Sequence, residues 1–581
     1  MSLLRRVSKF SDLCLPMLIC HPITSSNALV YPQSSTIFSG NYSAQVDLGY
    51  AIYEGITNAS TGLNTFKGIR YAAPPTGPLR WQPPQLPALN RTSVQPALSY
   101  GPICPQSFNA VPGNEFILGD EDCLNLNVYA PANADKLPVL VWIHGGGYGF
   151  FNGQQDMSSI ITTNNNTFIG VGIQYRAIAA SPYLPTQYRY NDFLPTQAYY
   201  AFAGASGCPA DFAYGNTTKT IFECLQSQDS LTLQQASYRI SASGTFGSWG
   251  FLPVTDGYFI RERPSEALLK RRINGQLLLT SNTAEEGPAY TPQTVTSEEE
   301  LMAWLLHTFP LLGIEDANRI LYYYPFVPPS DNTTLTYPTA GDSGASAITT
   351  SQIAHGHQQR ANLILGETTF MCPSYWLATA FSSPSTGHRS YKYQYSIPTA
   401  LHGYDLEADF GPPRRNQGTD FVRALQLSWG NFVRFGDPST PSSVADGTDS
   451  AGPEPHPLEH WPEFSAARPL MVDFNQTGGT PYEFTAVQVR NGGAGPERRA
   501  AYGCWRRGQE CDFAFGAGTD QRLSRRGRVW LGRGTRGEMR FLEEFWADCS
   551  RVIVDSRNVS TCYMLLARSL SKLAREPLCW I

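Results

Sequence analysis

The stretch that most constrains the fold is residues 137–149, which read LPVLVWIHGGGYG. Its apolar run from Val139 to Ile143 is rich in strand-forming residues, a pattern typical of a parallel strand buried on both faces. The run ends in His144 and three glycines, where the backbone can turn sharply and expose its N–H groups. Such a turn suits an oxyanion hole, which needs donors held ready for developing negative charge. A plain glycine-rich turn is the alternative.

The composition indicates a large globular protein. The chain has 581 residues, of which 42% are hydrophobic and 16% charged, with a net charge of −5. We therefore expect one large α/β unit with a substantial core. The acidic balance gives no indication of nucleic-acid binding, and no apolar run is long enough to span a bilayer. Zinc motifs, a P-loop and a GxGxxG after a strand are all absent, so we predict no metal and no cofactor.

Several features favour secretion. The chain has 12 cysteines, enough for several structural bridges. Basic residues precede a short apolar patch at 13–20, and Ser26 and Ala28 could flank a cleavage site. We predict a signal peptide over residues 1–28 and a secreted glycoprotein. Acceptor sites for N-glycosylation recur at Asn41, Asn58, Asn90, Asn165, Asn216, Asn332, Asn475 and Asn558.

Three motifs in order resemble the type-B carboxylesterase/lipase family, the cholinesterase-like branch of the α/β-hydrolases. They are FKGIRYAAPPTGPLRWQPP from Phe66, EDCLNLNV from Glu121, and WIHGGGYG from Trp142. The resemblance implies an α/β-hydrolase domain over residues 29–513, with a large mixed, mostly parallel sheet and helices on both faces. Residues 514–581 have no counterpart in the family. For this Arg-rich tail, a basic interaction segment and translated non-coding sequence remain alternative readings.

The resemblance also assigns roles by position. His402 matches the general base, and Glu286 matches the carboxylate that orients it. Without the resemblance, Glu286 would be read as a solvated turn carboxylate and His402 as an ordinary loop histidine. The other residues with implied roles are the oxyanion donors Gly146 and Gly147, the disulfide pairs Cys104–Cys123 and Cys208–Cys224, and the buried ion pair Arg80–Glu121.

The nucleophile that this chemistry requires is missing. After a predicted buried strand over 168–176, the family continues through a helix, a central strand and the elbow G-x-S-x-G, which bears the serine. That motif occurs nowhere in this sequence, and the chain passes directly from Arg176 to Ala177. We predict that a strand–helix segment is absent at this junction. Deleting a central strand leaves ladders of backbone groups unpaired, so we expect marginal stability or misfolding unless the flanking strands pair.

Three serines imitate the elbow incompletely. Ser248 in FGSWG has Phe246 in place of the first glycine, and Ser450 in TDSAG has Thr448 there. Ser343 in GDSGA is followed by alanine where the second glycine belongs. None satisfies the packing that a strained strand-to-helix turn demands.

Shorter signals predict individual elements. Residues 277–287, LLLTSNTAEEG, indicate a strand followed by a polar turn. Thr296 and Ser297, followed by glutamates, predict a capped helix that carries Leu301, Trp304 and Leu305. Residues 420–438 predict a late helix whose apolar side consists of Phe421, Leu425, Trp429 and Phe432.

Three functional hypotheses follow. The first is a secreted carboxylic ester hydrolase that acts on small-molecule or lipid esters through a serine acyl-enzyme, of which this chain is an incomplete version. The second is a non-catalytic relative that binds ligands or partner proteins. The third is an enzyme that uses another serine. The persistence of His402, Glu286 and the glycines favours the first, because a binding module does not need them. The oligomeric state is not predicted.

Overall fold

The computed structural model describes residues 42–173, 180–209, 218–324, 326, 354–383, 386–397, 400–414, 417–445, 456–474 and 488–490. The predicted signal peptide, the Arg176–Ala177 junction and the tail 514–581 lie outside the described residues.

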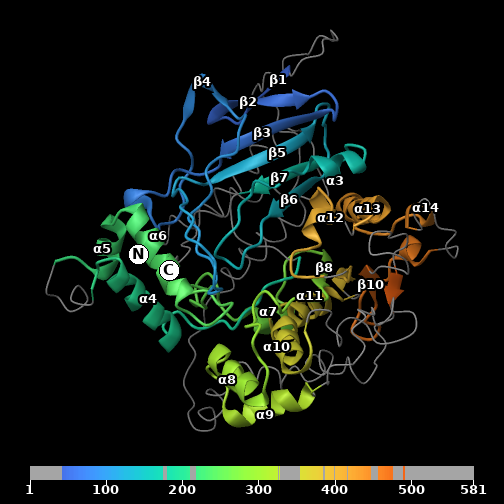
Figure 1. Ribbon diagram of the computed structural model, residues 1–581. Coiled ribbons are helices and arrows are strands. Elements are labelled where there is room, and N and C mark those ends of the chain that lie inside the picture. The colour runs from blue at the N-terminus through green and yellow to red at the C-terminus, as the bar shows by residue number, and fades with distance from the viewer. Residues whose placement is uncertain are drawn as a thin grey trace, which may run out of the picture.

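The N-terminal half forms a seven-stranded sheet (Figure 1). Neighbouring strands from β1 through β7 pair antiparallel, whereas β6 runs parallel to β7 and β4 parallel to β2. The strands follow the order β1 (Tyr42–Asp47), β2 (Ala51–Asn58), β3 (Leu63–Arg70), β5 (Asn125–Pro131), β7 (Ile169–Ile173) and β6 (Val139–Ile143), with β4 (Asn90–Pro96) beside β2.

A second, four-stranded sheet is formed later in the chain by β11 (Gln488–Arg490), β10 (Met471–Phe474), β9 (Arg389–Tyr395) and β8 (Leu277–Thr283). Strands β10, β9 and β8 are parallel. A mixed sheet with helices is consistent with the predicted α/β-hydrolase class. One detail differs: the described strands form two sheets, and the first is mainly antiparallel.

The two sheets end at β6 and β8, whereas in the chain β7 is the last strand before the predicted deletion and β8 the first described strand after it. Within the described residues, β6 pairs only with β7, and β8 pairs with β9 and through one isolated bridge from Ser281 to Ala180. The prediction that residues 139–143 are buried on both faces is therefore wrong in part. Only Val139 and Trp142 are fully buried, and among the described residues the strand has a partner on one side alone.

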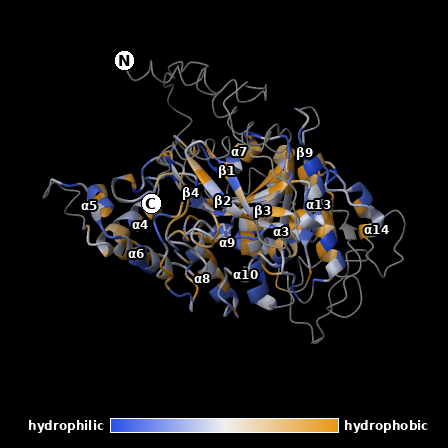
Figure 2. Cartoon of the chain, turned by 90° about the horizontal axis from the view of Figure 1, so that it is seen from above, coloured by the Kyte–Doolittle hydropathy of each residue, from blue (hydrophilic) through white to orange (hydrophobic). Residues whose placement is uncertain are grey.

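Helices lie on both sides of the second sheet. On β9, Tyr391, Tyr393 and Tyr395 pack with the α13 residues Phe421 and Leu425. Alternate side chains point the other way, and α11 contacts β8 and β9 there. In the view from above, α3 and α13 lie side by side, and the two helices are in contact (Figure 2).

The longer helices are α4 (Phe193–Ala205), α6 (Ser230–Ala242), α8 (Glu298–Thr308), α9 (Ile314–Tyr323), α10 (Gly356–Gly366), α11 (Cys372–Phe381) and α13 (Thr419–Phe435). The short ones are α3 (Ser158–Thr163), α5 (Ile221–Ser227), α7 (Pro264–Leu269), α12 (Leu406–Phe410) and α14 (Ser442–Ala445). Single turns are η2 (Gly77–Leu79), the π-helical η4 (Glu367–Met371) and η6 (Pro457–His460). No helix in the described part of the chain is long and apolar enough to cross a membrane.

The predicted helix signals are confirmed. Ser297 caps α8 by accepting from the Glu300 N–H, while the Glu300 carboxylate accepts from the Ser297 N–H. Leu301, Trp304 and Leu305 are buried. Helix α13 ends at Gly436, whose left-handed φ of +69° allows the chain to leave the helix.

Candidate active site

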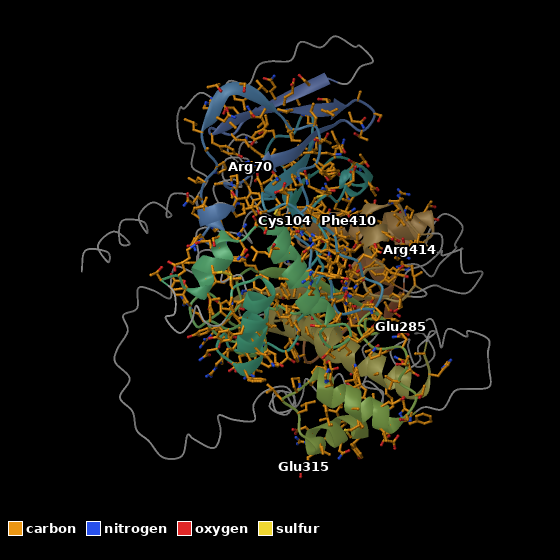
Figure 3. All side chains as sticks on the ribbon, turned by 60° about the vertical axis from the view of Figure 1, so that its left-hand side comes forward. Arg70, Cys104, Glu285, Glu315, Phe410 and Arg414 are labelled. Carbon is orange, nitrogen blue, oxygen red and sulfur yellow. A yellow bond between two sulfur atoms is a disulfide. The ribbon has the colours of Figure 1, made fainter. Side chains whose placement is uncertain are left out.

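A carboxylate and a histidine meet at the end of the second sheet. Strand β8 ends at Thr283, and three residues later Glu286 is completely buried. Its Oε1 accepts from the Thr283 N–H at 2.7 Å, and its Oε2 lies 2.5 Å from His402 Nδ1. Its neighbour Glu285, which is also buried, is labelled below Phe410 in the view of Figure 3. The two residues that the resemblance assigned as orienter and base thus form a hydrogen-bonded dyad.

The surroundings of His402 fix its ring. Its centroid lies 4.6 Å from that of Phe370 on η4 and 5.3 Å from that of Tyr290. Because an ionised carboxylate only accepts hydrogen bonds, the Nδ1–H donates to Glu286, and Nε2 keeps its lone pair for a proton. Burial alone would lower the pKa of His402, but the charge and hydrogen bond of Glu286 outweigh it and raise that pKa above its usual value.

The glycine turn after β6 presents unused donors. Gly146 and Gly147 have φ values of +115° and +56°, a backbone conformation that residues other than glycine rarely adopt. A Cβ on Gly147 would lie 2.3 Å from the Trp249 ring, and one on Gly146 would lie 2.0 Å from the Phe150 carbonyl oxygen. Neither N–H donates a hydrogen bond to any residue that the structure describes. The turn therefore requires glycine and leaves two N–H groups available.

An aromatic cluster of Tyr183, Trp249, Tyr290 and Phe370 links this turn to the dyad. Trp249 packs against Gly147, and its ring lies 5.9 Å from that of Tyr290. Tyr183 lies 5.2 Å from Trp249 and 5.3 Å from Phe370. The turn and His402 therefore lie at opposite ends of one cluster. The resemblance did not assign these aromatic side chains.

Two buried acids accompany the dyad and were not predicted. Asp405 and Asp409 are 1% and 0% exposed, and neither oxygen of Asp409 has a hydrogen-bond partner. Burial, followed by the charge of Glu286, raises the pKa of Asp405 to about 6. Burial and the neighbouring Asp405 raise the pKa of Asp409 well above its usual value. The spacing of these residues resembles an ordinary helix surface, so their burial could not be predicted from the sequence.

The structure joins Cys104 to Cys123 and Cys208 to Cys224. In the loop closed by the first bridge, Ile117 and Leu118 are exposed, at 43% and 57%.

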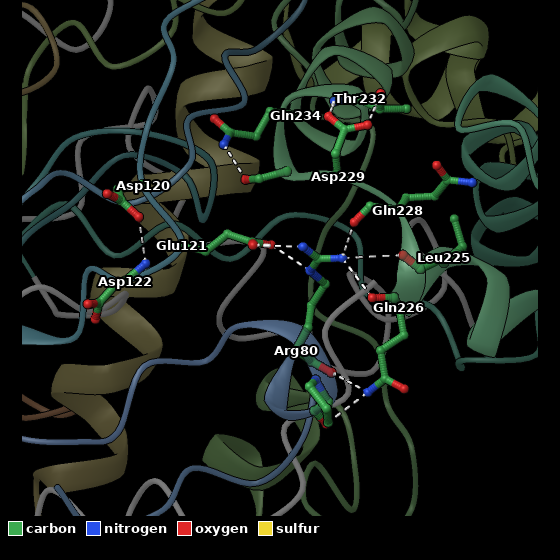
Figure 4. A network of polar contacts seen from close by, with 12 residues as sticks. Arg80, Asp120, Glu121, Asp122, Leu225, Gln226, Gln228, Asp229, Thr232 and Gln234 are labelled. Carbon is green, nitrogen blue, oxygen red and sulfur yellow. Dashed lines mark hydrogen bonds and ion pairs between the residues drawn. The ribbon is translucent and has the colours of Figure 1, made fainter. Parts of the chain in front are cut away.

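Arg80 anchors this loop to α5 (Figure 4). Its Nε and Nη2 donate to the two carboxylate oxygens of Glu121 at 2.6 and 2.7 Å. Its Nη1 donates to the carbonyls of Leu225, Gln226 and Gln228, which close the C-terminal end of α5. Both side chains are largely buried, at 8% and 17% exposure. The pair is thus part of a larger network that also serves as a helix cap.

The described replacement serine is not a nucleophile partner for His402. Ser248 Oγ donates to the Thr245 carbonyl at 2.6 Å, and its own carbonyl accepts from the Ala110 N–H. Ser343 and Ser450 lie outside the described residues. Among the described residues, the His402 ring makes its hydrogen bond to Glu286 alone. The described part of the chain also contains no group of three His, Cys, Asp or Glu side chains placed to hold a metal ion.

Comparison with known proteins identifies the family of the chain. A model of the carboxylesterase family matches residues 43–180 and 176–489, so the two matched ranges meet at the predicted junction. Carboxylesterase patB from Penicillium expansum is 24% identical over 539 residues, covering 71% of this chain and 90% of the relative. Phenmedipham hydrolase from Pseudarthrobacter oxydans is 40% identical, but over 126 residues, or 20% of this chain and 24% of the relative.

The fold is also that of solved esterases. The crystal structure of Aspergillus niger EstA superposes with a TM-score of 0.61 and 19% identity, covering 81% of this chain and 99% of that one. At this identity the likeness concerns the fold alone.

Proposed function

The chain belongs to the carboxylesterase family of carboxylic ester hydrolases, and from this premise we propose that it carries the proton-transfer and oxyanion parts of a serine esterase site. The observation that supports the proposal most strongly is the dyad. A buried Glu286 lies 2.5 Å from Nδ1 of a histidine whose Nε2 remains available. A protein that only binds a ligand does not need this arrangement.

The proposed chemistry is acyl transfer. His402 would take the proton of an attacking serine through Nε2 and return it to the leaving alkoxide, while Glu286 stabilises the imidazolium. The N–H groups of Gly146 and Gly147 would donate to the oxyanion, and losing one such donor typically slows catalysis by about 10²- to 10³-fold. The serine is not supplied by any G-x-S-x-G motif in the chain, so we propose that it belongs to a segment absent between Arg176 and Ala177. The substrates would be small-molecule or lipid carboxylic esters.

Restoring that segment tests the proposal. The strand–elbow–helix segment of the patB relative is inserted between Arg176 and Ala177, and hydrolysis of p-nitrophenyl butyrate is measured. We expect activity from the restored chain, labelling of its serine by a fluorophosphonate, and neither from the chain as written. Two controls, serine to alanine in the insert and His402→Gln, should each abolish activity while the protein stays folded.

Two results would overturn the proposal. One is a folded, restored chain that neither hydrolyses the ester nor reacts with the fluorophosphonate. The other is stoichiometric fluorophosphonate labelling of the chain as written, which would show that another serine acts as the nucleophile.

A further inference from the structure

A lysine is completely buried close to the dyad. Lys392 lies on β9, between the buried Ser390 and Gln394, and all three side chains are at most 1% exposed. Lysine is almost never fully buried without a partner, since removing an ammonium group from water costs several kcal/mol. Its position therefore requires an explanation.

Lys392 is connected to Glu286 through hydrogen bonds to residues of β8. Its Nζ donates to Asn282 Oδ1 on β8 at 2.5 Å and to Ser374 Oγ on α11 at 2.8 Å. The ammonium also lies 4.3 Å from the centre of the Tyr375 ring, a cation–π contact. Asn282 precedes Thr283, whose N–H holds Glu286. The lysine is thus fixed in a polar layer directly beside the segment that carries the dyad carboxylate.

Charge explains why a cation is useful there. When His402 is neutral and able to accept a proton, the Glu286 carboxylate is a buried negative charge whose neutral hydrogen-bond donors do not cancel it. Burial lowers the pKa of Lys392, and the negative charge of Glu286 acts in the opposite direction and favours the ammonium form. Among the described residues, Cys372 and Tyr375 on α11 also face Lys392, and the buried Asp405 acts on His402 and raises its pKa.

We propose that Lys392 is a positioning residue for the dyad: its buried ammonium compensates the charge of Glu286 in the state in which His402 is neutral. The inference rests on the proposed role of the dyad. Glu286 raises the pKa of His402, and the positive charge of Lys392 acts in the opposite direction. Lys392 therefore keeps the pKa of His402 low enough for the histidine to be neutral and act as a base.

Titration of His402 by NMR in the full chain tests this without turnover. Lys392→Met removes the charge but keeps a chain of similar length, and replacing a buried charge by a packed apolar side chain is commonly tolerated. We expect the His402 midpoint to rise by about half a pH unit or more, as for loss of a nearby cation. Lys392→Arg, which retains the charge, should move it by less than about 0.2 unit. Gln394→Met is the matched control, because it disturbs the hydrogen bond to Asn282 without changing charge.

The outcomes separate this inference from the proposed function. If Glu286→Gln shifts the His402 midpoint downward while a folded Lys392→Met leaves it in place, the dyad stands and the role of Lys392 is refuted. An equal shift from Gln394→Met would also refute it, since the effect would then be structural. If Glu286→Gln has no effect either, the dyad itself is refuted.

Discussion

Removing Arg80 should destabilise the protein much more than removing Glu121, although the two form one ion pair. Arg80→Met leaves the Glu121 carboxylate, 17% exposed, without the guanidinium that makes both of its hydrogen bonds. It also strips three carbonyls at the end of α5 of their donor. Loss of one partner from a buried pair costs about 3–5 kcal/mol. This is a large part of a total stability of about 5–15 kcal/mol.

Glu121→Gln should cost less. Arg80 then keeps its three carbonyl acceptors at a helix C-terminus, where a cation is favourable. The loss reduces to charge-assisted hydrogen bonds, about 1.5–3 kcal/mol. Urea titration followed by tryptophan fluorescence measures both variants, with near-ultraviolet circular dichroism to verify the native state. A Glu121→Gln loss equal to or larger than that of Arg80→Met would refute the claim that Arg80 serves both the carboxylate and the helix end.

Three further predictions concern the glycine turn, the buried acids and the surface. Gly147→Ala should lower the free energy of unfolding by about 2–4 kcal/mol, because Gly147 has a positive φ and a Cβ there would clash with Trp249. Gly145→Ala is the control: a Cβ at Gly145 would meet open space, so the urea midpoint should stay nearly unchanged. Asp409→Asn should stabilise the protein at pH 7. Asp409 stays protonated in the folded wild type, whereas in the unfolded chain it loses its proton above the usual pKa of an aspartate. The free energy of unfolding of the wild type therefore falls as the pH rises. That gain should shrink by at most about 1.4 kcal/mol per pH unit toward pH 4, and a gain independent of pH would contradict the reasoning. When the protein is expressed through a secretory pathway, treatment with peptide N-glycosidase should lower its mass by removing N-linked glycans. A secreted product without glycans would contradict the acceptor role of the exposed Asn58, Asn90 and Asn165.

Much of the fold was predictable because local signals and the resemblance agreed. The Ser297 cap, the α13 apolar side and the strand before Glu286 are set by short-range patterns. The burial of β6 was predicted less well, because a strand's environment depends on its neighbours, and here one side lacks a described partner.

The site divides in the same way. Residues tied to a motif, such as Gly146, Gly147 and His402, could be assigned from position. The burial of Lys392 could not be predicted. The alternating polar residues Ser390, Lys392 and Gln394 are typical of a strand face exposed to solvent, but in the structure α11 covers that face. The burial of Asp409, whose two oxygens have no hydrogen-bond partner, could not be predicted either, because burial by elements distant in sequence leaves no local pattern.

The central claim is that the dyad and the glycine turn belong to an ester hydrolase whose nucleophile segment is absent between Arg176 and Ala177. Sequencing the messenger RNA across these two codons tests it most directly. We predict an in-frame segment that encodes a strand and a G-x-S-x-G elbow. A message that joins the two codons directly in every copy would contradict the claim, and would indicate a chain that keeps Glu286 and His402 without using them for ester hydrolysis.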